Sequence, residues 1–170
     1  MTPTSASDAE IRTLLSFLDG QRRHVLGIVE GLDAAALRLP VLPSGWTCLG
    51  LIQHLALDVE RFWFRAVVAG DPGVIKALDD IDDAWQASPD VSHTEVIDRY
   101  RAETKLSDIT LSTTAVDTPL AWWPRHLFGE PHLHNVRDVL LHVITETACH
   151  AGHLDAAREL IDGRQWLVLT

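Results

Sequence analysis

The sequence predicts an all-α protein, a four-helix bundle with long crossover connections. Apolar residues recur at spacings of three and four in four separate segments, and the Pro and Gly residues gather between these segments. No stretch alternates apolar and polar residues for long enough to form a sheet. The chain has 170 residues, of which 46% are hydrophobic, so we expect it to bury a core as a single domain over residues 1–170.

Each expected helix has recognisable start or stop signals. Two starts carry a capping box, in which a Ser and a Glu three residues later satisfy each other's backbone amides. Gly follows three of the four segments, as is common where the chain leaves a helix. The expected helices run from Ser7 to Gly31, from Leu49 to Gly70, from Ser92 through a stripe that includes Leu106, and from Asn135 to Gly163.

Two long connections separate the last three helices. Residues 71–90 are acidic and mixed, so we expect a loop with at most a short helical turn. The acids of this loop are expected to be solvated: Asp79, Asp80, Asp82 and Asp83. Residues 111–134 contain three prolines, two tryptophans and three histidines, and predict an irregular crossing that could include a short strand or hairpin.

Composition excludes several classes of partner. The 24 acidic residues outnumber the 14 basic ones, which gives a charge of −10 and argues against binding to nucleic acid. No run of about 20 apolar residues is present to span a membrane, and the acidic start does not resemble a signal peptide. Two cysteines, Cys48 and Cys149, are too few for a disulfide framework. These features predict a cytoplasmic protein without a nucleic-acid or membrane partner.

A cluster of polar residues marks the last helix. His142, Glu146, His150 and His153 are spaced four, four and three residues apart, which places them within an arc of about 80° on a helix. Residues four apart can hold one metal ion between them. Since His150 belongs to the apolar stripe, Glu146 is expected to face an apolar interior, where an unpaired carboxylate is unfavourable. A divalent metal would satisfy it; a solvated His-rich face or a hydrogen-bonded Glu–His pair are the alternatives.

The second helix offers a third metal ligand. His54 flanks the apolar stripe, and Asp58 lies one turn further on. Neutral imidazole is a common metal ligand, and Asp58 or a backbone carbonyl could accept from the other ring nitrogen and fix the tautomer. The alternative is that His54 is simply a hydrogen-bonded residue at the boundary of the core.

The segments SGWTCLGLIQHLALDVERFWF and VRDVLLHVITETACHAGHLDAARELIDG resemble the DinB-like superfamily of four-helix bundles. They fall in the branch that also resembles mycothiol-dependent maleylpyruvate isomerase. This resemblance implies a divalent metal, zinc or nickel, held by His54, Glu146 and His150. The last motif of the family commonly reads H-x-G-Q, and His153 stands in place of the Gln. His153 could therefore be a fourth ligand, a support for the other ligands or an outward-facing residue, and a direct role for His142 is less expected.

The resemblance also implies an activity. We expect a metal-dependent enzyme that uses a small thiol, such as mycothiol or bacillithiol, with an electrophilic substrate in S-transfer or isomerisation. Three protein ligands would leave one metal position open. Arg61 is a candidate anchor for carboxylates, and Trp123 and His126 are candidate walls on the open side of the metal. The sequence identifies no catalytic residue.

Two other functions remain open at this stage. The first is a non-catalytic metal-binding or stress-response module, which would have a buried His and Glu but no access channel. The second is maleylpyruvate isomerase itself, which would need a positive pocket for a dicarboxylate and has an additional carboxy-terminal domain without a counterpart here. Bundles of this superfamily often pair, so the resemblance also implies a homodimer.

Overall fold

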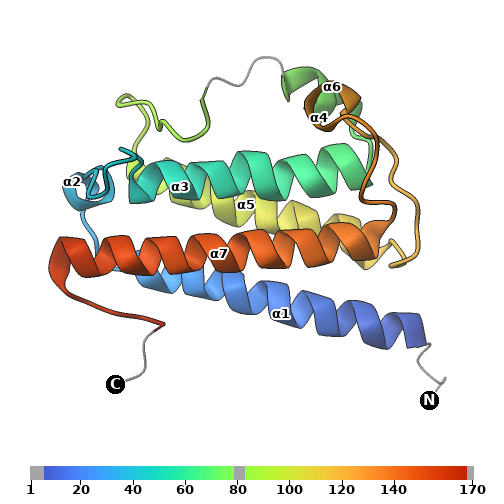
Figure 1. Ribbon diagram of the computed structural model, residues 1–170, viewed down its shortest axis with the longest axis horizontal. Helices are drawn as coiled ribbons and strands as arrows, with labels where there is room; N and C mark the ends of the chain where they lie inside the picture. Colours follow the sequence, from blue (N-terminus) through green and yellow to red (C-terminus); the bar gives the residue numbers. More distant parts are fainter. Residues whose placement is uncertain (1–5, 79–82, 168–170) are drawn as a thin grey trace.

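Four long helices lie side by side in the computed structural model, which describes residues 6–78 and 83–167 (Figure 1). They are α1 (Ala6–Val29), the continuous pair α3 (Cys48–His54) and η1 (Leu55–Val68), α5 (His93–Ser112) and α7 (Val136–Asp162). α1 and α7 run in one direction, and α3, η1 and α5 run in the other (Figure 1). η1 ends and α5 begins at opposite ends of the bundle, whereas α5 ends and α7 begins at the same end (Figure 1). The predicted all-α bundle is confirmed.

Side-chain caps begin the helices where the sequence places them. The Ser92 hydroxyl accepts from the Glu95 amide at 3.2 Å, and the Glu95 carboxylate accepts from the Ser92 amide at 2.9 Å, which completes the capping box. Asn135 caps α7, and Gly163 ends it with a left-handed φ of 77°. The side chain of Ser7, the other predicted cap, lies outside the described residues.

The second long helix is wound in two ways. It begins at Cys48 as an α-helix and continues from Leu55 to Val68 with the wider turn of a π-helix. At its end the Ala69 amide donates to the carbonyl of Phe64, five residues back, at 3.1 Å. Residues four apart share a face in both windings, so the apolar spacing that predicts this helix does not distinguish them.

The connections contain short helices rather than strands. α2 (Ala34–Leu37) follows α1, α4 (Pro72–Ala77) follows η1, and α6 (Arg125–Phe128) precedes α7. The strand or hairpin considered for residues 111–134 does not form; the described part of this segment has only an isolated bridge between Pro119 and Asn135. Asp79, Asp80 and Asp82 lie outside the described residues, and Asp83 is exposed.

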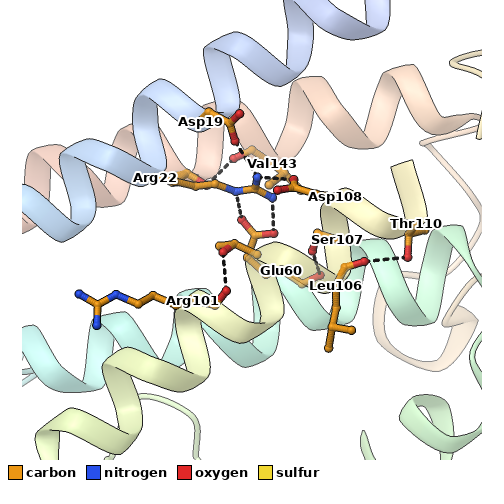
Figure 2. A network of polar contacts seen from close by, with 11 residues as sticks. Asp19, Arg22, Glu60, Arg101, Leu106, Ser107, Asp108, Thr110 and Val143 are labelled. Atoms are coloured by element: carbon orange, nitrogen blue, oxygen red, sulfur yellow. Dashed lines mark hydrogen bonds and ion pairs between the residues drawn. The ribbon is translucent and has the colours of Figure 1, made fainter. Parts of the chain in front are cut away.

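The core is mostly apolar, and one of its buried polar groups is an ion cluster between α1, η1 and α5 (Figure 2). The Arg22 guanidinium forms two hydrogen bonds of 2.7 Å with the Glu60 carboxylate and also bonds Asp19 and Asp108. Arg22 is 5% exposed and Glu60 1% exposed. Among the helices that the structure describes, none combines the length and the apolar character needed to cross a membrane.

Candidate metal centre

Three donor side chains meet between two antiparallel helices. His54 is the last residue of α3, and Glu146 and His150 lie one turn apart on α7. One donor atom from each lies within 4.8 Å of the other two. The structure therefore brings together the three residues that the helical spacing and the family resemblance predict as ligands.

The His54 ring is held in a fixed orientation by contacts that engage only one of its two nitrogens. Its Nδ1 lies 2.9 Å from Oδ2 of Asp58, and the indole of Trp85 stacks on it with a centroid distance of 4.1 Å. A hydrogen on Nδ1 donates to the Asp58 carboxylate, which leaves Nε2 with its lone pair. This Nε2 is buried and has no hydrogen-bond partner among the residues that the structure describes. Because buried polar atoms are nearly always paired, the unpartnered lone pair fits a bound cation.

His150 and Glu146 complete the donor set. His150 is only 7% exposed, and its Nε2 lies 3.1 Å from Oε1 of Glu146. Burial, together with the neighbouring His54, lowers the pKa of His150 below its ordinary value. The His150 ring is therefore neutral near pH 7, which is the form that binds metals. Two imidazoles and one carboxylate are a donor set that suits zinc and other divalent transition metals.

The other two histidines of α7 lie at the edges of this cluster. His153 is exposed, and its Nδ1 is 3.4 Å from Nδ1 of His150, but it is not among the three residues whose donors converge. His142 is half-buried and packs edge-on against Trp63 at 4.6 Å. Burial lowers the pKa of His142.

A cavity of about 610 Å³ opens beside the donor cluster, and His54 and Glu146 belong to its lining. A molecule in this cavity would therefore reach the candidate metal centre directly. Most of the remaining wall is apolar and comes from three separate segments, with Phe62 and Trp63 on η1, Trp85 in the connection that follows α4, and Leu127 and Phe128 on α6.

The residues predicted to bind a cofactor lie outside this lining. Arg61 faces a different hollow, shared with Arg99 and Glu103 of α5. Trp123 packs behind the wall, 6.2 Å from Trp63, and His126 is exposed on α6. Arg61 is seven residues from His54, a spacing that nearly restores the face in an α-helix but does not in the wider turn of η1.

The two cysteines are not placed for chemistry at the centre. Burial raises the pKa of Cys48 to about 11, so this thiol is protonated at neutral pH. Cys149 is exposed. Neither lines the cavity.

Trp85 packs on both imidazoles of the cluster, although no motif or spacing in the sequence marks it as a site residue. Its centroid is 4.1 Å from that of His54 and 5.5 Å from that of His150. The signal available in the sequence is a Trp that follows a run of acidic residues. A large aromatic ring is rarely left exposed to solvent, so this Trp is expected to pack against the bundle. Gly50 makes room for this segment, because a Cβ there would lie 2.0 Å from the Trp85 carbonyl oxygen.

Comparison with known families yields one match over most of the chain. A family model described as Mycothiol-S-transferase matches residues 13–163, which contain all three convergent donors and the aromatic wall. No curated protein and no solved structure matches significantly.

Proposed function

This chain belongs to the mycothiol S-transferase family, and from that membership we propose that it joins the sulfur of mycothiol to an electrophilic small molecule. The observation that carries the proposal is the buried, unpartnered Nε2 of His54 among the donors of Glu146 and His150. The adjoining cavity gives the second substrate a place next to these donors. A non-catalytic module would have no use for such access.

We propose that His54, Glu146 and His150 hold a divalent ion, zinc or nickel. When bound, such an ion stabilises a thiolate, the nucleophilic form of a thiol, at neutral pH. The chain's own contribution is to aim the ligands. Asp58 keeps the proton on Nδ1 of His54, and Trp85 holds the ring flat against its indole.

The charge of the cavity favours mycothiol over other small thiols. Glutathione and bacillithiol carry carboxylates, whereas the headgroup of mycothiol is a neutral, sugar-like unit. No Lys or Arg lines the cavity among the residues that the structure describes, so a carboxylate would find no basic side chain to pair with there. The same observation argues against maleylpyruvate, a dicarboxylate, as the substrate.

The test is conjugation of mycothiol to monochlorobimane, followed by the fluorescence of the product. We expect the zinc- or nickel-loaded protein to accelerate the reaction with mycothiol and to leave the reactions with glutathione and bacillithiol near their uncatalysed rates. His54→Ala should lose this acceleration. The matched control is His134→Ala, which removes an exposed imidazole whose side chain lies outside the cavity and the donor cluster.

Two outcomes would contradict the proposal. One is a loaded protein that accelerates conjugation of none of the three thiols, and it would favour the non-catalytic metal-binding or stress-response module. The other is acceleration that persists unchanged in His54→Ala. Equal acceleration with all three thiols would keep transferase activity and remove the preference for mycothiol.

We also propose a cytoplasmic location, where small thiols are kept reduced, and a homodimer. Large apolar side chains are exposed on α1, α5 and α7, including Phe17 (61%), Ile109 (65%) and Leu160 (60%). Light scattering in solution tests the dimer, and a mass of 18.9 kDa would exclude it.

A further inference from the structure

We infer that the electrophile taken by this cavity is an uncharged molecule with a flat aromatic ring, and that the cavity rejects anionic electrophiles. This inference rests on the proposed function and adds the substrate class of the same site. It is carried by two independent features of the lining, the arrangement of its aromatic side chains and the sign of its charges.

The aromatic side chains of η1 and α6 form one continuous wall. The rings of Trp63 and Phe128 stack with a centroid distance of 5.8 Å and an interplanar angle of 14°. Phe62 meets both of them edge-on, at 5.0 Å from Trp63 and 6.1 Å from Phe128. Flat rings bury area against such a wall with favourable stacking or edge-to-face geometry. The wall therefore fits a planar aromatic substrate.

With histidine counted as neutral, the formal charges of the lining at pH 7 are all negative. Asp58, Asp83 and Glu146 contribute three carboxylates, and the lining described by the structure contains no Lys or Arg. The sequence between Leu78 and Asp83, Asp79-Asp80-Ile81-Asp82, contains no basic residue. Arg61, the residue predicted to anchor carboxylates, lines a different hollow.

These charges determine which substrates can enter. One divalent ion at the donor cluster would offset two of these three negative charges and leave the lining with a net charge of −1. A substrate carboxylate would give up its hydration next to an apolar wall and meet a net negative charge without a basic side chain to pair with, which is unfavourable on both counts. A neutral aromatic ring meets neither obstacle.

A matched pair of substrates expresses this selectivity. In 2-chloro-1,3-dinitrobenzene and 4-chloro-3,5-dinitrobenzoate the thiolate sulfur forms a bond to the ring carbon that carries chlorine, and the C–Cl bond breaks with its electron pair leaving as chloride. The thiol proton passes to solvent, so no oxidant or reductant is needed. The two substrates undergo the same displacement and differ in the added carboxylate.

Binding of unreactive analogues tests the inference without requiring turnover. We expect 1,3-dinitrobenzene to quench the tryptophan fluorescence of the zinc-loaded protein with a dissociation constant at least about tenfold lower than that of 3,5-dinitrobenzoate, equivalent to about 1.4 kcal/mol. Equal affinities, or no binding of 1,3-dinitrobenzene, would overturn the inference. Tighter binding of the benzoate would overturn it as well.

A variant that adds a positive charge to the lining shows whether the selectivity arises in this cavity. Leu127 lines the cavity and is 57% exposed, so Leu127→Arg adds a cation at the lining with little demand on folding. It should bring the affinities of the two analogues together. Leu160→Arg is the matched control, since Leu160 is similarly exposed on α7 and outside the lining, and it should leave the selectivity unchanged. An unchanged selectivity in Leu127→Arg would place the selective site elsewhere and overturn the inference.

Turnover then separates this inference from the proposed function. Rates with mycothiol and each chlorinated substrate are divided by the uncatalysed rates, and we expect the neutral substrate to be favoured at least about tenfold. Acceleration of both substrates to the same extent would overturn the substrate class and keep the transferase. If binding is selective but neither the chlorinated substrates nor monochlorobimane react faster than without the protein, the proposed transferase activity would be contradicted and the binding preference would stand.

Discussion

Two buried polar clusters lie along the same helix, and they differ in whether the protein completes them. At Glu60 on η1, the carboxylate accepts two hydrogen bonds from Arg22, and Asp19 and Asp108 accept from the rest of the guanidinium (Figure 2). Burial alone would lower the pKa of Arg22, but its hydrogen bonds to Glu60 raise it well above the ordinary value. We call this cluster closed, because its charged groups pair with one another within the protein.

At His54, six residues earlier, the cluster is open. Nδ1 is paired with Asp58, but Nε2 is buried without a partner while the donors of Glu146 and His150 lie within 4.8 Å. Only this second cluster adjoins the cavity of about 610 Å³. The difference indicates that the Arg22–Glu60 cluster stabilises the bundle, whereas the His54 cluster is arranged for a ligand from outside the chain.

The largest expected effect is on the closed cluster. Arg22→Met leaves the buried Glu60 carboxylate without its counterion and should lower the free energy of unfolding by about 3–5 kcal/mol. Urea denaturation at neutral pH measures it. The double variant Arg22→Met/Glu60→Leu removes both charges and should recover most of the loss. A loss below about 1 kcal/mol in the single variant, the range of an exposed pair, would show that the cluster is not a buried ion pair in solution.

The open cluster should respond to metal rather than to charge removal. His150→Ala removes one of three ligands, so it should abolish the stabilisation that bound metal gives the native state, about 2.7 kcal/mol at 100 times the dissociation constant. Thermal unfolding with and without chelator measures this stabilisation by metal. In the variant, chelator should have no effect. His153→Ala should keep the chelator response, and loss of the response there would identify His153 as a fourth ligand.

A smaller effect is expected where the open cluster is supported indirectly. Asp58→Asn weakens the acceptor at Nδ1 of His54 and should reduce metal affinity by about 10–100-fold without changing the number of ions bound. Competition with a chromophoric chelator measures the affinity. Asp98→Asn is the control, because Asp98 is exposed on α5 and pairs with Arg101. Unchanged affinity in Asp58→Asn would show that Asp58 does not orient the ring.

The smallest effect is expected at Tyr100, next to the closed cluster. Its hydroxyl is fully buried and has no hydrogen-bond partner within residues 6–78 and 83–167. Since Tyr100→Phe removes an unsatisfied polar group and breaks no hydrogen bond, it should be neutral or stabilising by about 1 kcal/mol at most. A destabilisation of more than about 1 kcal/mol in denaturation would show that the hydroxyl belongs to the ion cluster after all.

The features predicted from the sequence are those that depend on local spacing. The capping box at Ser92 and the Asn135 cap fix helix starts through residues three positions away, and both are confirmed. The convergence of Glu146 and His150 follows from one helical turn, and the pairing with His54 follows from the family resemblance. These relations require little knowledge of how distant segments pack.

The cavity could not be predicted in the same way, because its wall is assembled from separate segments. Trp85 and Phe128 lie in connections whose course is set by tertiary packing, not by periodicity. Arg61 lies outside the cavity lining for a different reason. The winding of η1 changes which residues share a face with His54, and the apolar spacing does not reveal that change.

The most direct test of the difference between the two clusters is the metal stoichiometry of the purified protein. Protein prepared without chelator and supplied with zinc or nickel is dialysed and analysed for metal, alongside His54→Ala and Arg22→Met. We predict one equivalent of metal in the wild type, none in His54→Ala and one per folded molecule in Arg22→Met, since the closed cluster takes no part in binding. A wild type that retains less than about one-tenth of an equivalent after supplementation, where tight binding would saturate the site, would contradict the assignment of the His54 cluster as a metal centre.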